Sequence, residues 1–297
     1  MGMQAFCRIL LALAHHETDA SLIAYGRMLA RMLPAAEFDC VHVTPGGGAS
    51  PAAREALTAH IRQYLGDAWD PGRFRSHALD GVRLDRLLQF SADHRCDLIL
   101  LGHRRDRGGR RSLARRLAMK APCSVWLAPE GSPAKMSRIL APVDFSARSA
   151  DALDVACRLA ASAGSDDITA LHVYFNDAAT IYDDYGEALL DGEASDFHKF
   201  LARIDLHGVD VLPVFVESAA VSRTICRVAS ERDCDLIVMG TRGRTRSAAV
   251  LLGSETEHVI MNTEIPVLAV KHFGAELRLL RVLLERRFQD KGEERYG

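Results

Sequence analysis

The sequence predicts an α/β protein with two tandem open α/β sandwich domains, each with a five-stranded, mostly parallel sheet of the Rossmann-like type. The first observation is a repeat: "RILLALAHHETDASLIAYGRMLA" from Arg8 aligns with "RILAPVDFSARSADALDVACRLA" from Arg138. Later in each copy, "CDLILLGHR" from Cys96 aligns with "CDLIVMGTR" from Cys234. The second observation is that short aliphatic runs alternate with segments of helical period, which is typical of parallel strands covered on both faces by helices.

Length and composition fit this duplication. A chain of 297 residues with 48% hydrophobic content is long enough to bury two cores. Glycine, serine and proline cluster at 129–137, which predicts the junction there. We therefore predict a first domain over 1–130, a second over 136–273 and a C-terminal tail over 274–297.

The second copy shows its elements in order. The predicted strands are "RILAPV" (138–143), "DITALHVY" (167–174), "DVLPVFV" (210–216), "DLIVMG" (235–240) and "PVLAVK" (266–271). Between the first two, apolar residues recur at steps of three and four, which predicts a helix with one apolar face: Ala152, Val155, Ala156, Leu159 and Ala160. The opening "MGMQAFCRILLALAHH" is interpreted as the matching first strand rather than a leader peptide, because its apolar part is short.

Several classes of protein are disfavoured by composition. Seven cysteines without a C-x-x-C pair indicate reduced thiols and a cytoplasmic protein rather than a disulfide framework or a zinc ribbon. The repeat-related Cys96 and Cys234 are expected to be small buried thiols. No apolar run is long enough for a membrane span. The net charge of -2 points to no class of partner.

A ligand is expected at one edge of the second copy. In open α/β sheets ligands lie beyond the carboxyl ends of the strands, where the strand order reverses, and Asp144 and Gly240 directly follow predicted strands. The spacing G-x2-G-x9-G-S then leads into a predicted helix "SETEHVIMNT". Its unpaired first-turn amides and the hydroxyls of Ser254 and Thr256 would seat phosphate oxygens. Walker, dinucleotide and nucleophile-elbow motifs are missing from the sequence.

These strands and this loop spacing resemble the universal stress proteins of the tandem, ATP-binding type, whose fold is called adenine nucleotide alpha hydrolase-like. The resemblance covers the chain except for the tail from Gly274. It implies ATP as the ligand, with AMP or ADP as alternatives and Mg²⁺ as an optional companion. By matching position it implies that the nucleotide is bound by Pro142, Val143, Asp144, Val173, Met239, Gly240, Arg242, Gly243, Gly253, Ser254, Glu255 and Thr256.

Glu255 departs from the family pattern, in which this position is more often a small aliphatic residue. A carboxylate near phosphates repels them unless it points away or helps to hold a metal ion, and the sequence leaves both alternatives open. No lysine stands in the loop, so turnover of a bound nucleotide is expected to be slow at best.

The first copy lacks several of these features. Ala14 stands at the position of Asp144, Arg105 stands at that of Gly243, and the segment from Gly102 to Pro122 is shorter than its counterpart. We therefore predict that the first half does not bind a nucleotide in the same way. Its arginine-rich segment 104–120 is either a solvated, positively charged helix face or a site for a polyanion or acidic partner. Nucleic acid is disfavoured, because aromatic residues do not interleave with the arginines.

The leading hypothesis is a nucleotide-dependent stress-response regulator that acts on an unknown protein partner. The alternatives are a slow ATPase or phosphoryl or nucleotidyl transferase that uses the same pocket, and a non-catalytic interaction scaffold. The family resemblance implies that the halves form an intramolecular pseudo-dimer through their last strands, with a homodimer as the alternative. The tail is predicted to be an amphipathic helix that covers its own chain or binds another subunit. His42 and His172 share a repeat position, which suggests a packing or edge role.

Overall fold

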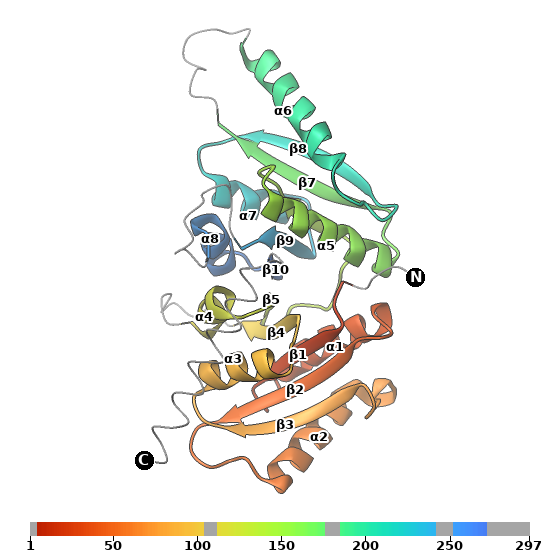
Figure 1. Ribbon diagram of the computed structural model, residues 1–297, viewed down its shortest axis with the longest axis vertical. Helices are drawn as coiled ribbons and strands as arrows, with labels where there is room; N and C mark the ends of the chain where they lie inside the picture. The colour runs from red at the N-terminus through yellow and green to blue at the C-terminus, as the bar shows by residue number, and fades with distance from the viewer. Residues whose placement is uncertain (1–4, 104–111, 176–184, 242–251, 272–297) are drawn as a thin grey trace. The chain divides into compact units, whose positions relative to one another are not determined.

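A computed structural model describes residues 5–103, 112–175, 185–241 and 252–271 (Figure 1). The chain divides into two compact units, the first built from residues up to Lys135 together with Lys271, and the second from Met136 to Val270. The division lies within the predicted junction 129–137. The tail 274–297, residues 104–111 of the arginine-rich segment and the loop positions Arg242 and Gly243 lie outside the described residues.

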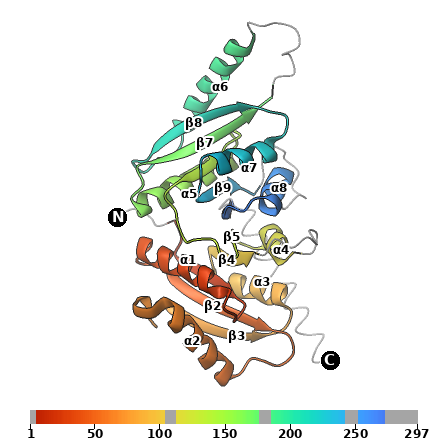
Figure 2. The same cartoon turned by 180° about the vertical axis from the view of Figure 1, so that it is seen from behind.

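The first unit alternates strands and helices along the chain. Its elements are β1 (Arg8–Leu13), α1 (Asp19–Met32), β2 (Glu37–Thr44), α2 (Pro51–Leu65), the 3-10 turn η1 (Gly66–Ala68), β3 (Phe74–Asp80), α3 (Arg83–Asp93), β4 (Leu98–His103), α4 (Leu113–Lys120) and β5 (Ser124–Pro129). The strands pair in the order β3-β2-β1-β4-β5, and every one of these pairs is parallel. Helix α1 contacts α2, and α3 contacts α4. Figures 1 and 2 show these two pairs on opposite faces of the strands.

The second unit repeats this plan. Its elements are β6 (Ile139–Pro142), α5 (Ala147–Ala163), β7 (Asp167–Tyr174), α6 (Tyr185–Leu201), β8 (Asp210–Glu217), α7 (Val221–Glu231), β9 (Leu236–Gly240), α8 (Ser254–Asn262) and β10 (Val267–Val270). The order β10-β9-β6-β7-β8 is again parallel throughout. The predicted α/β fold with five parallel strands in each half is confirmed.

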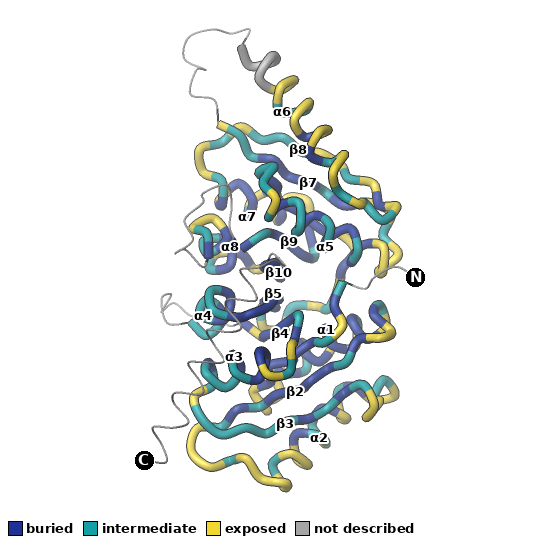
Figure 3. The backbone as a smooth tube through the Cα atoms, viewed as in Figure 1, coloured by how far each residue is buried: buried dark blue, intermediate teal, exposed yellow. Residues whose placement is uncertain are grey.

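Burial explains why the strands read as nearly continuous apolar runs. Strand β10 is buried along its whole length, and β1 is buried from Ile9 onward, as the dark blue strands of Figure 3 show. Both faces of these two strands are covered, so side chains pointing either way must be apolar. Cys96 and Cys234 are buried immediately before β4 and β9, as predicted.

Helix α5 shows how the local sequence sets an element's limits. The Ser146 hydroxyl accepts a hydrogen bond from the Ser149 amide at 3.2 Å and caps the first turn. Gly164 ends the helix with φ +73°, a left-handed conformation that favours glycine. The five apolar positions that predicted this helix are all buried.

Candidate functional site

The sheet of the second unit reverses its strand order at β6. Strand β6 pairs with β7 on one side and with β9 on the other, and all three strands are parallel. Their carboxyl ends therefore lie at the same edge, where Asp144 follows β6 and Gly240 ends β9. Two predicted site segments that are far apart in the sequence thus meet at the usual ligand position of this fold class.

The loop after β6 holds the Asp144 carboxyl group in a defined place. The amide of Ser146 donates to Asp144 Oδ1 at 3.1 Å, and the Asp144 amide lies 3.4 Å from Ser149 Oγ. Asp144 is half-buried. The loop is therefore fixed by short-range contacts at the N-terminus of α5.

His172 on β7 anchors the same loop from the side. Its Nδ1 lies 2.8 Å from the carbonyl oxygen of Val143, and its Nε2 lies 3.1 Å from the Glu193 carboxylate on α6. The ring stacks on Phe145, with centroids 4.2 Å apart. Phe145 has φ +62°, so this stacking contact accompanies a backbone conformation that is rare for aromatic residues.

The first unit repeats part of this arrangement. His42 Nδ1 lies 3.3 Å from the carbonyl of Leu13, the repeat counterpart of the contact between His172 and Val143. The packing role expected of the two histidines is therefore seen in both halves. The recurrence of histidine was the only sequence signal for it, and nothing in the sequence pointed to Glu193.

Helix α8 begins with Gly253 at its N-cap. Glycine has no side chain to cover the first-turn amides, so no side-chain hydrogen bond caps this helix. The Gly253 backbone has φ -70° and ψ 149°, which any residue can adopt. The backbone conformation therefore does not require glycine here, although glycine is among the residues favoured at helix N-caps. Ser254, the first helical residue, is exposed.

Thr256 has a partner within the protein. Its residue is 3% exposed, and its Oγ1 donates a hydrogen bond of 2.9 Å to the carbonyl of Gly240. In addition, the Gly253 amide donates to the Thr241 carbonyl at 2.7 Å. These two hydrogen bonds connect the start of α8 to the end of β9, so the Thr256 side chain fixes the position of α8 and is not free to contact a ligand.

Glu255 turns toward the neighbouring helix. Its Oε2 accepts a hydrogen bond of 2.8 Å from the amide of Ser222 in the first turn of α7. The residue before that helix, Ala220, supplies no side-chain cap, so the Glu255 carboxylate takes this role. Of the two alternatives that the sequence left open, the structure shows the carboxylate held by α7.

The remaining predicted residues lie on the strands of this edge. Met239 is buried in β9, Val143 is buried after β6, and Pro142 and Val173 are half-buried in β6 and β7. Among the described residues, no group of three or more histidine, cysteine or acidic side chains is placed to hold a metal ion.

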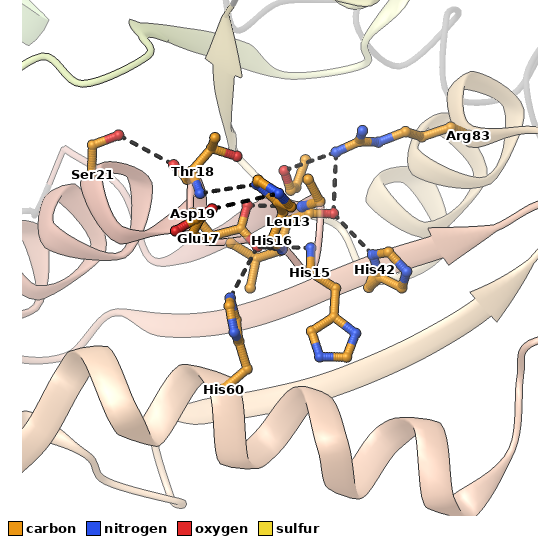
Figure 4. A network of polar contacts seen from close by, with 12 residues as sticks. Leu13, His15, His16, Glu17, Thr18, Asp19, Ser21, His42, His60 and Arg83 are labelled. Atoms are coloured by element: carbon orange, nitrogen blue, oxygen red, sulfur yellow. Dashed lines mark hydrogen bonds and ion pairs between the residues drawn. The ribbon is translucent and has the colours of Figure 1, made fainter.

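The corresponding loop of the first unit is closed by a carboxylate. Asp19, which stands at the repeat position of Ser149, accepts hydrogen bonds from the amides of Ala14 (2.8 Å), His15 (2.8 Å) and His16 (3.2 Å). His60 Nε2 also lies 3.3 Å from Asp19 Oδ2, and Figure 4 shows this cluster of contacts around Asp19. The amides that form an anion-binding concavity in such loops are thus occupied by the chain itself.

Two further observations concern membrane-spanning helices and cysteines. The described part of the chain contains no helix that is long and apolar enough to cross a membrane. All seven cysteines have free thiols.

Comparisons with known proteins agree with the fold. A family model described as the universal stress protein family matches residues 136–271. Universal stress protein MJ0531 of Methanocaldococcus jannaschii is 51% identical over 47 residues, or 16% of this chain and 28% of that relative, so the match spans less than a third of the relative.

A solved structure shares the fold over nearly the whole chain. A functionally unknown protein, PA1789, from Pseudomonas aeruginosa PAO1 has a TM-score of 0.73 at 18% identity over 95% of this chain and 98% of its own. A universal stress protein in complex with cAMP is 25% identical over 45% of this chain and 95% of its own, with a TM-score of 0.33. The family match over residues 136–271 identifies the second half of the chain as a universal stress protein domain.

Proposed function

We propose that the second half binds one adenine nucleotide, with ATP as the leading candidate, and that the protein acts as a nucleotide-dependent regulator. The observation that carries this proposal is the start of α8. Gly253 leaves the first-turn amides without a side-chain cap, and Ser254 is exposed beside them at the edge where Asp144 and Gly240 end their strands. Such amides, together with the helix dipole, favour phosphate oxygens.

Under this proposal the predicted site residues have different tasks. The main-chain amides at 254–256 and the Ser254 hydroxyl are the groups we expect to touch phosphate. Thr256 holds Gly240 in position, and Glu255 directs its charge to the amide of Ser222. Because the Glu255 carboxylate is held at the Ser222 amide, we expect that it does not repel the phosphates and does not bind a metal ion.

The same assignment favours a regulator over an enzyme. Glu255 was one of two carboxylates available as a general base at this edge, and its Oε2 is bonded to α7. The other, Asp144, accepts the Ser146 amide at 3.1 Å. Slow turnover therefore fits the site better than fast hydrolysis. Because its cysteines have free thiols, we propose that this regulator is cytoplasmic. Its protein partner is not identified.

The experiment compares two substitutions at the start of α8. Gly253→Val puts β-branched bulk where main-chain amides must touch oxygen, so it should remove several charge-assisted hydrogen bonds, each worth roughly 1.5–3 kcal/mol. Ser254→Ala removes one hydroxyl. At about 1.4 kcal/mol per factor of ten, we expect about a hundredfold loss of ATP affinity for the valine and about tenfold for the alanine.

The controls separate phosphate binding from folding. Adenosine has no phosphate and should bind the second half of all these variants almost equally. Gly192→Val makes the same change on α6, where an added Cβ would meet nothing within 4 Å, and should leave ATP binding unchanged. If Gly253→Val folds normally by circular dichroism and binds ATP like the wild type, the proposed phosphate site is wrong.

A further inference from the structure

The loop after β1 in the first unit carries a cluster of histidine rings. His15 lies in the loop, His42 on β2 and His60 on α2, where Tyr64 contacts the His60 ring at 5.1 Å between centroids. The centroid of His15 is 5.3 Å from that of His42 and 5.1 Å from that of His60, and Figure 4 shows the His15 ring between the other two. Histidine gains its charge between about pH 8 and 5, so this cluster becomes more positive as the pH falls.

The second unit builds the same loop around a ring that cannot gain a proton. Phe145 stands at the repeat position of His15, and both residues have a left-handed backbone, with φ +62° and +59°. Phe145 stacks on His172, whose Nε2 lies 3.1 Å from the Glu193 carboxylate. A charge gained by His172 therefore meets a carboxylate, whereas a charge gained by His15 meets two further histidines. The two loops share a backbone conformation but differ in their response to acid.

The Asp19 carboxylate on α1 balances one positive charge at this cluster. Its Oδ2 lies 3.3 Å from His60 Nε2, in a contact that lacks the geometry of a hydrogen bond. The same carboxylate accepts hydrogen bonds from the amides of Ala14, His15 and His16 and so holds the loop closed. A proton on His60 pairs with Asp19, but a further proton on His15 places like charges in neighbouring rings.

The other charged groups described around this loop do not offset that repulsion. Arg83 on α3 donates to the Leu13 carbonyl at 3.1 Å, and His42 Nδ1 lies 3.3 Å from the same oxygen. Arg83 therefore adds a permanent positive charge on this side. The Glu17 side chain is 84% exposed and lies 3.9 Å from His16, so water screens its charge.

Acid should therefore weaken the closed loop. Partial burial lowers the pKa of His15, and His60 and His42 lower it further, against the opposing effect of Asp19. His15 thus takes up a proton more readily when the loop is open. The closed loop has its full stability above the ordinary histidine pKa of about 6.5, and it loses stability as the pH falls through that value toward the lowered one.

We propose that the loop after β1 is a pH-sensitive switch: protonation of His15 beside His42 and His60 releases the amides of residues 14–16 from the Asp19 carboxylate, while the corresponding loop of the second unit stays in place. The first half then responds to a fall in pH through a loop that the second half keeps fixed with an aromatic ring.

Amide hydrogen exchange of the full-length protein without added nucleotide tests this switch at about pH 7.5 and about pH 5.5. After correction for the intrinsic exchange rate, protection at residues 14–16 should fall about threefold or more between the two conditions. The change is modest because the His15 ring is exposed and water screens its charge. Protection in β1 and at residues 144–146 should stay the same.

His15→Phe copies the second unit and should remove the effect of acid. Phe145 already adopts the same left-handed conformation, so this variant should fold. His94→Phe is the matched control, because it removes a histidine of the same unit whose ring contacts are with Phe90 and His77. It should lose protection at residues 14–16 in acid as the wild type does.

His60→Gln gives a second readout that does not depend on the folding of His15→Phe. It removes a neighbouring positive charge, so the midpoint of the His15 ring titration, followed by nuclear magnetic resonance, should rise toward the ordinary value of about 6.5. An unchanged midpoint would overturn the proposal. So would protection at residues 14–16 that does not fall in acid, an equal fall in His15→Phe, or a loss of protection across the whole first unit, which would indicate unfolding.

Discussion

Replacing Thr256 by valine tests whether this residue stabilises the proposed nucleotide site. The change keeps the side-chain shape but removes the hydroxyl that donates to the Gly240 carbonyl at 2.9 Å, at a residue that is 3% exposed. Leaving the carbonyl without this donor costs about 1–3 kcal/mol, and the added methyl group returns about 0.8 kcal/mol. We therefore expect the free energy of unfolding of the second unit to fall by up to about 2 kcal/mol.

Urea unfolding followed by far-ultraviolet circular dichroism measures this change, and ATP titration measures its effect on the site. Thr256→Ser keeps the hydroxyl and is the matched control. We expect the valine variant to bind ATP several-fold more weakly than the serine variant, because α8 loses a tie to the end of β9. Equal stability and equal ATP affinity of the two variants would refute the bracing role.

Two further predictions concern charged groups with assigned partners. Burial alone would raise the pKa of Asp39, but hydrogen bonds from His77 at 2.9 Å and Arg8 at 3.0 Å hold it below its ordinary value. The stability that this carboxylate contributes is therefore present above the ordinary aspartate pKa of about 4 and is lost as the pH falls through the lowered value. Asp39→Asn should remove that part of the acid dependence in urea unfolding curves measured from pH 6 to 2, and an unchanged dependence would contradict the assignment. Glu255→Gln removes the negative charge beside the Ser222 amide, so the N-terminus of α7 should lose about 0.3–1 kcal/mol of stabilisation. Amide hydrogen exchange in the first turn of α7 should then be faster. An unchanged exchange rate would show that this contact does not stabilise the helix.

The fold was predictable because its determinants are local and periodic. The repeat that aligns Arg8 with Arg138 predicted two similar units, and the apolar spacing from Ala152 to Ala160 predicted the buried face of α5. Parallel strands must be apolar on both faces when helices cover both, so the strands could be located from the short apolar runs in the sequence.

The details of the site depend on packing between elements that are distant in sequence. Glu255 meets Ser222 only because α8 packs beside α7, and no local pattern encodes that contact. The sequence identified the loss of the carboxylate at Ala14 but not the use of Asp19 to fill the same loop.

The central claim is that the second half alone holds an adenine nucleotide with phosphates. Native mass spectrometry of freshly purified full-length protein tests it most directly. It measures the mass of ligand bound to each chain directly after incubation with ATP, and again after further incubation without free ATP. We predict one ATP per chain in the wild type, slow or no conversion to ADP, and loss of the bound mass in Gly253→Val but not in Gly192→Val. Two equivalent ATP molecules per chain, rapid conversion to ADP, or a bound mass that survives Gly253→Val would contradict the account.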